Sequence, residues 1–115
     1  MPKACAQTIF AGHRTAPGKR PVDVLVTASC RADEPWSIRL SCVDEQAREI
    51  DTWSFSRGAL FDGLTGSVTR GGVTVQPFGF ALLFFLNSGP ARRSLVQLDR
   101  AEVASFLVRL IISGA

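Results

Sequence analysis

Two neighbouring segments of the chain alternate between apolar and polar residues, and this spacing restricts the folds that are open to it. The apolar positions are Val22, Val24, Val26, Ala28 and Cys30 in the first segment, and Trp36, Ile38, Leu40 and Cys42 in the second. Because successive side chains of a strand point to opposite faces, each segment predicts a strand with one buried face. Residues 4–11 and 49–55 are predicted as further strands, and 13–21 as a loop.

The middle of the chain begins with a short helix that we predict at residues 56–63. The hydroxyl of Ser56 can cap this helix, and Gly63 stands where a helix end favours glycine. Two short strands follow, separated by a turn at residues 71–72. Residues 80–86 are apolar throughout, which predicts a central strand covered on both faces. Residues 87–90 are predicted as a turn and 93–98 as the last strand.

A second, longer helix is predicted at residues 99–112. Asp99 and Glu102 have the spacing of a capping box. The apolar stripe comprises Val103, Phe106, Leu107, Leu110 and Ile111. Val108 and Ile112 widen this stripe, which indicates either a subunit interface or a helix lying deep between two sheets. The element order predicts an α+β fold with seven or eight antiparallel strands.

Length and cysteine content restrict the class of protein further. The 115 residues suffice for one domain, which we expect to span 1–115. The longest apolar run, seven residues, is too short to cross a bilayer, and the first residues lack a convincing signal-peptide core, so membrane insertion and secretion are not expected. Three cysteines, Cys5, Cys30 and Cys42, fit buried thiols in a reducing compartment, which predicts a cytoplasmic protein.

Residues for catalysis or metal binding are sparse. His13 is the one histidine, and no other ligand type stands near it at metal-binding spacing. The sequence holds neither a nucleophile motif nor a phosphate-binding glycine loop. The acidic residues at 44–51 are explained by a solvated hairpin. We therefore expect no enzyme activity, no catalytic residues, no cofactor and no metal.

Nucleic-acid binding is a second function class to weigh. The net charge is +3 and the isoelectric point about 9.1, but the basic residues are dispersed rather than clustered. Trp36, Trp53 and Phe55 lie on predicted strands and could stack on single-stranded bases, but at alternating strand positions core packing is the ordinary explanation. No specific nucleic-acid binding is expected, and a single-stranded nucleic-acid-binding module remains the alternative.

Five segments carry a resemblance to a known family. Residues 53–64, WSFSRGALFDGL, resemble the stretch W-x-F-x-R-x-L-L-x-x-G-L of the SsgA-like proteins, which act in actinobacterial sporulation and cell division. In the same order, 34–38 resembles D-P-Y-A-V, 71–77 resembles G-D-V-R-V-W-P, 86–91 resembles L-x-S-P-x-G-x-A, and 106–109 resembles F-L-x-R-T. The resemblance covers about residues 20–114.

The resemblance implies a fold and a function. The implied fold is whirly-like, with two packed antiparallel sheets in a barrel-like body, a short middle helix and a long C-terminal helix. The implied protein is a non-catalytic homotrimer at the division septum. It would recruit or position the division-ring protein FtsZ or other septation proteins through protein contacts.

The densest family match supplies the predicted partner-binding site. It comprises Trp53, Arg57, Leu60 and Gly63. Arg57 is the most informative of them, because a cation at a helix start opposes the helix dipole and so needs another reason to be there. The alternative is that Arg57 pairs with Asp62 and only fixes the corner between strand and helix. Val108 and Ile112 are the predicted oligomer interface.

Overall fold

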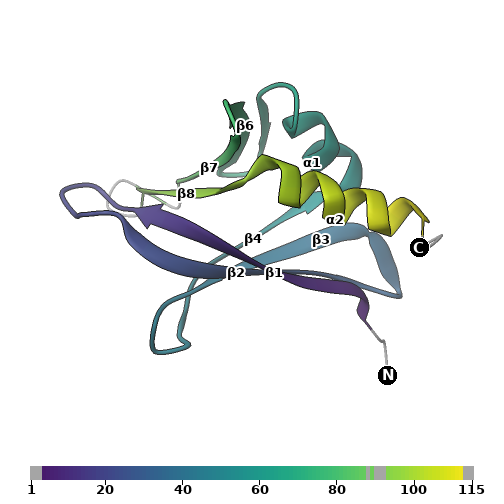
Figure 1. The fold of residues 1–115 in the computed structure, drawn as a ribbon, viewed down its shortest axis with the longest axis horizontal. Coiled ribbons are helices and arrows are strands. Elements are labelled where there is room, and N and C mark those ends of the chain that lie inside the picture. Colours follow the sequence, from purple (N-terminus) through teal and green to yellow (C-terminus); the bar gives the residue numbers. More distant parts are fainter. Residues whose placement is uncertain (1–3, 88, 90–92, 113–115) are drawn as a thin grey trace.

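The computed structural model describes residues 4–87, 89 and 93–112, with the side chains of 4, 5, 111 and 112 outside the description. This part of the chain forms eight strands and two helices (Figure 1). In chain order the elements are β1 (Ala4–Thr15), β2 (Val22–Arg31), β3 (Glu34–Val43), β4 (Glu49–Ser56), α1 (Arg57–Gly63), β5 (Val68–Arg70), β6 (Val73–Phe78), β7 (Ala81–Asn87), β8 (Arg93–Asp99) and α2 (Arg100–Ile112). The predicted α+β class is confirmed.

The eight strands form one continuous antiparallel sheet in the order β4-β3-β2-β1-β8-β7-β6-β5. The two packed antiparallel sheets that the resemblance implies are not confirmed, because the described strands belong to a single sheet. β1 pairs with β2 along most of its length but with β8 only at His13–Thr15. This short join lets the sheet bend, so its two four-stranded halves lie at an angle, with both helices on one side of the lower half (Figure 1).

The core fills the space between the two halves and the helices. The alternating positions of β2 and β3 are buried as predicted, with Val26, Ile38 and Leu40 less than 2% exposed. The ring of Phe84 on β7 lies 5.3 Å from that of Trp53 and 6.2 Å from that of Phe55, both on β4. These contacts join the β5–β8 half of the sheet to the β1–β4 half.

Both helices begin at the residues that the sequence indicates. Ser56 Oγ accepts a hydrogen bond from the Ala59 backbone N–H at 3.1 Å, and Asp99 Oδ1 accepts one from Glu102 at 3.1 Å. On α2 the stripe residues Val103, Phe106, Leu107 and Leu110 are buried. The Phe106 ring packs edge-on against Phe10, at 6.1 Å between centroids, which seats the helix on β1.

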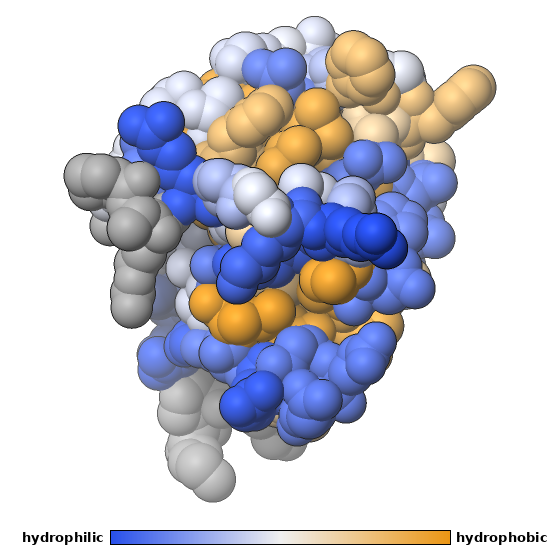
Figure 2. Space-filling view, turned by 90° about the vertical axis from the view of Figure 1, so that its left-hand side faces the viewer, coloured by the Kyte–Doolittle hydropathy of each residue, from blue (hydrophilic) through white to orange (hydrophobic). Residues whose placement is uncertain are grey.

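The outward face of the half formed by β5–β8 is more exposed than the sequence predicted. Residues 80–86 were predicted to be covered on both faces, but Phe80 is 91% exposed and Phe85 39%. The strand begins only at Ala81, because Gly79 has a positive φ of 60° in the turn that carries Phe80. Figure 2 shows apolar side chains over the upper part of one end of the molecule and in a second area below a hydrophilic band.

The cysteines also differ from expectation. Cys42 is a buried free thiol, as predicted, and its burial raises its pKa to about 11. Cys30, in contrast, is buried and disulfide-bonded. The prediction of buried thiols therefore holds for Cys42 and is wrong for Cys30. The predicted turn at 87–90 lies mostly outside the described residues.

Candidate functional site

The four residues predicted to bind a partner lie close together, around the corner between β4 and α1. Trp53 is 5% exposed, Leu60 is 1% exposed and Gly63 is buried, while Arg57 is partly exposed. Gly63 lies so close to β6 that a Cβ there would stand 2.6 Å from Val75 Cγ1. Three of the four therefore shape and support this corner, and Arg57 reaches its surface.

A hollow of about 460 Å³ opens beside Arg57. It is lined by Trp36 of β3, by Ser56, Arg57, Gly58, Phe61 and Asp62 at the start and outer side of α1, and by Leu107 of α2. The register of the sheet explains why Trp36 lies here, because Ser37 pairs with Ser56 and so brings the start of β3 beside the start of α1. Three elements thus meet at one surface.

Two large aromatic side chains that line this hollow are exposed to solvent. Trp36 is 60% exposed and Phe61 is 53% exposed. Exposed aromatic side chains grouped around a charged group are typical of protein-contact surfaces, where Trp and Arg contribute most to binding. We call the set formed by Trp36, Arg57, Phe61 and Asp62 the aromatic corner.

Phe61 and Trp36 both face outward, although apolar residues at these positions of a helix and a strand are commonly buried. The buried positions of α1 are Ala59, Leu60 and Gly63, and the helical period turns Phe61 away from them. Trp36 was expected on the buried face with Ile38 and Leu40, but it is 60% exposed, whereas Ile38 and Leu40 are fully buried.

The other aromatic candidates lie in the core. Trp53 and Phe55 pack against Phe84, so neither presents a face on which a nucleic-acid base could stack. The Trp53 indole N–H is buried and has no hydrogen-bond partner among the described residues. This leaves Trp36 as the exposed member of the three proposed stacking residues.

Reactive groups do not converge at the aromatic corner. His13 lies elsewhere, on β1, where its Nδ1 is 2.9 Å from the Asp23 carboxylate, and both side chains are mostly exposed. Within the described residues, no three His, Cys, Asp or Glu side chains are grouped to hold a metal ion. The corner offers apolar surface, one cation and one carboxylate, which suits binding of a protein surface.

The predicted oligomer interface lies on α2. Val108 is 47% exposed beside the buried Leu107, so α2 presents an apolar side chain to solvent at this point. Arg109, the next residue, places its guanidinium 5.9 Å from the Phe106 ring centroid. The side chain of Ile112 lies outside the described residues.

A family model described as Streptomyces sporulation and cell division protein SsgA matches residues 24–111. The chain belongs to the SsgA family. A relative within reach of sequence comparison is the sporulation-specific cell division protein SsgB of Frankia casuarinae, 31% identical over 96 residues. That match covers 81% of this SsgA-family chain and 66% of the relative, so the chain spans just under two thirds of the relative's length.

Solved structures share the fold of this SsgA-family member. An SsgA-like sporulation-specific cell division protein from Thermobifida fusca superposes with a TM-score of 0.81 at 20% identity, over 91% of this chain and 78% of the other. A second structure, from work on SsgB mutations that correlate to longitudinal cell division during sporulation of Streptomyces coelicolor, gives 0.80 at 18% identity, over 96% and 87%.

Among the described residues, neither helix is long and apolar enough to cross a bilayer.

Proposed function

We propose that this SsgA-family protein acts in sporulation-specific cell division as a non-catalytic adaptor. It recruits or positions FtsZ or other septum-forming proteins through direct contacts on the cytoplasmic side of the division septum. The observation that carries the proposal is the aromatic corner, where the exposed Trp36 and Phe61 line one hollow together with Arg57. Membership of a family of sporulation and cell division proteins supports it.

The architecture of the corner supports a contact role for Arg57. Its position is set by Ser56, whose side chain caps α1, and by the buried Leu60 and Gly63, which hold the helix on the sheet. A guanidinium that lines a hollow with exposed aromatic side chains can add a hydrogen bond to a carboxylate of a partner, and the rings can exclude water from it. The predicted site residues thus act together, with Trp53, Leu60 and Gly63 as its support and Arg57 as its contact.

We further propose that the protein assembles as a homotrimer through the exposed flank of α2. Val108 supplies exposed apolar surface there, and a subunit contact would remove it from water. Assembly would present several copies of the aromatic corner to the division machinery. Linking several weak binding sites in one assembly raises the overall affinity for a partner that contacts more than one of them.

Deletion of the gene in a strain carrying a fluorescent division-ring marker tests the proposed function. We expect fewer or misplaced rings and septa during sporulation, restored by the wild-type gene in trans. Septa of unchanged number and position in the deletion strain would contradict the division role. Arg57→Ala, if it folds and assembles like the wild type, is expected to fail to restore septation.

A further inference from the structure

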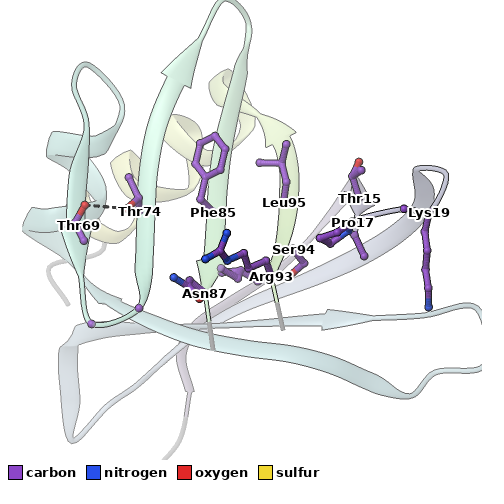
Figure 3. A pocket seen from close by; sticks show the side chains of 15 residues that line it. Thr15, Pro17, Lys19, Thr69, Thr74, Phe85, Asn87, Arg93, Ser94 and Leu95 are labelled. Carbon is purple, nitrogen blue, oxygen red and sulfur yellow. Dashed lines mark hydrogen bonds between the residues drawn. The ribbon is translucent and has the colours of Figure 1, made fainter. Parts of the chain in front are cut away.

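A second hollow lies on the outward face of β5–β8, apart from the aromatic corner (Figure 3). Its floor is a row of residues paired from strand to strand: Thr69 with Thr74, Thr74 with Phe85, Phe85 with Leu95, and Leu95 with Thr15. Residues 15–19, at the end of β1 and in the following turn, form a wall at one side. The hollow has a volume of about 790 Å³.

We propose that this hollow binds an extended peptide segment of a partner protein in which carboxylate side chains stand beside apolar ones. We refer to it as the β5–β8 hollow. The proposal goes beyond the function assigned to the aromatic corner, because it names a second surface and the chemistry of its occupant.

The charge of the β5–β8 hollow favours an acidic occupant. Arg93 and Lys19 line it, and its described lining residues include no aspartate or glutamate. Neither cation forms an ion pair or a side-chain hydrogen bond with another described residue. Figure 3 shows the Arg93 side chain lying beside Asn87 and below Phe85. A guanidinium exposed in this way can bind a carboxylate through two parallel hydrogen bonds.

The spacing of the floor matches an extended peptide. Asn87 pairs with Arg93, and Phe85 pairs with Leu95, so a polar row and an apolar row lie two residues apart along the strands. Rows separated in this way are about 6.8 Å apart, which is also the distance between same-face side chains of an extended peptide. A carboxylate over Arg93 therefore places the peptide's next same-face side chain over Phe85 and Leu95.

The turn between β5 and β6 holds its side of the hollow close to β7. Gly72 accepts a hydrogen bond from the Asn87 backbone N–H at 2.9 Å, and a Cβ at Gly72 would stand 2.5 Å from the Asn87 carbonyl oxygen. Gly71 has a positive φ of 59°, a conformation that glycine adopts without strain. The two glycines thus allow the β5–β6 turn to lie against the end of β7, which completes the floor of the hollow.

A single-stranded nucleic acid fits this hollow less well than a peptide does. Such ligands bind along tracks of several cations with open aromatic faces for base stacking. Here the described lining holds two cations, Arg93 on β8 and Lys19 in the turn after β1, which form no continuous track. Phe85, the aromatic residue of the floor, is only 39% exposed. The observations therefore favour the peptide.

The test is an NMR titration of the full-length, ¹⁵N-labelled protein with a peptide of Glu-Ser-Leu-Ser repeats, in which glutamate and leucine alternate on one face of the extended chain. We expect saturable shifts at the amides of Thr15, Thr74 and Asn87, and at least about fivefold weaker binding to Arg93→Gln and to Phe85→Ser. Arg39→Gln removes a similarly exposed arginine from the other half of the sheet and should bind like the wild type. Trp36→Ser should also bind normally, which separates this proposal from the proposed function.

Three outcomes would overturn the proposal. One is the absence of shifts at the floor at millimolar peptide. Another is equal weakening by Arg93→Gln and Arg39→Gln, which would indicate attraction to overall charge. The third is tighter binding of an oligothymidylate at the same residues, which would assign the hollow to nucleic acid. Each variant is first compared with the wild type by thermal unfolding, and Leu95→Ser replaces Phe85→Ser if the latter does not fold.

Discussion

The side chains of Arg14 and Asp51 form an ion pair that joins β1 to β4 across the sheet. Arg14 Nε donates to Asp51 Oδ2 at 2.7 Å, and Ser94 Oγ of β8 donates to the same oxygen at 3.3 Å. The arginine and aspartate side chains are only 22% and 20% exposed. Since β4 and β8 belong to different halves of the sheet, this cluster ties the halves together where β1 and β8 pair for three residues.

Arg14→Ala should destabilise the fold by about 2 kcal/mol, because it leaves a largely buried carboxylate with a weaker set of partners. Chemical denaturation monitored by tryptophan fluorescence measures this. Arg31→Ala is the matched control, since the Arg31–Asp33 pair is of similar length, 2.8 Å, but is 61% and 51% exposed. Its cost should stay below about 1 kcal/mol. Equal costs for the two variants would show that the Arg14 cluster does not hold the halves together.

Gly63→Ala should also be destabilising, by about 1–3 kcal/mol, because the added methyl group collides with Val75 on β6. Gly58→Ala on the same helix is the control. A Cβ at Gly58 meets nothing within 4 Å, so this variant should be stabilised by about 0.4–1 kcal/mol through its helix preference. Thermal unfolding of the two variants should therefore move in opposite directions. A Gly63→Ala protein as stable as the wild type would remove the packing reason for glycine at this position.

The Cys42 thiol gives a pH-dependent prediction. Burial is the main cause that raises its pKa to about 11, and the neighbouring Asp51 carboxylate adds to the effect. The folded pKa thus exceeds the ordinary value of 9.0, so the neutral thiol contributes stability that is complete below pH 9 and is lost as the pH rises toward 11. Urea unfolding across this range should show a steeper loss for the wild type than for Cys42→Ala. Parallel curves for the two proteins would contradict the assignment.

Assembly through α2 is tested by Val108→Asp. This substitution places a charge on the exposed apolar flank of the helix and should shift the protein from trimer to monomer in light scattering at micromolar concentration. Because Val108 is 47% exposed, the monomer itself should remain folded. A wild-type protein that stays at 12.4 kDa at every concentration, or a trimer that survives the substitution, would exclude this interface.

Local patterns predicted the elements well because the interactions that form them are local. The alternation around Val26 and Leu40 follows from strand geometry, and the caps at Ser56 and Asp99 each accept a hydrogen bond from the backbone N–H three residues later. The joining of the halves was not predictable in this way. It depends on His13–Thr15 pairing with Leu95–Gln97, which lie 80 or more positions later, and no repeat or spacing in the sequence indicates such a contact.

The candidate site was predicted in part. The family motif at 53–64 located the corner and Arg57, but it did not distinguish the residues that support the corner from those that face outward. That distinction depends on which strand and helix cover each side chain. Trp36, from a segment 17 residues before Trp53, joins the site only because the β3–β4 register brings Ser37 opposite Ser56.

The central claim is that the protein supports septation through the aromatic corner. Complementation of a deletion strain with Trp36→Ser/Phe61→Ser tests it most directly, scored by the number and spacing of division rings in sporulating cells. Phe80→Ser is the matched control, because Phe80 is an even more exposed aromatic residue outside the corner. We predict that both proteins fold and accumulate, that the control restores regular rings, and that the double variant does not. Full restoration by the double variant would contradict the claim.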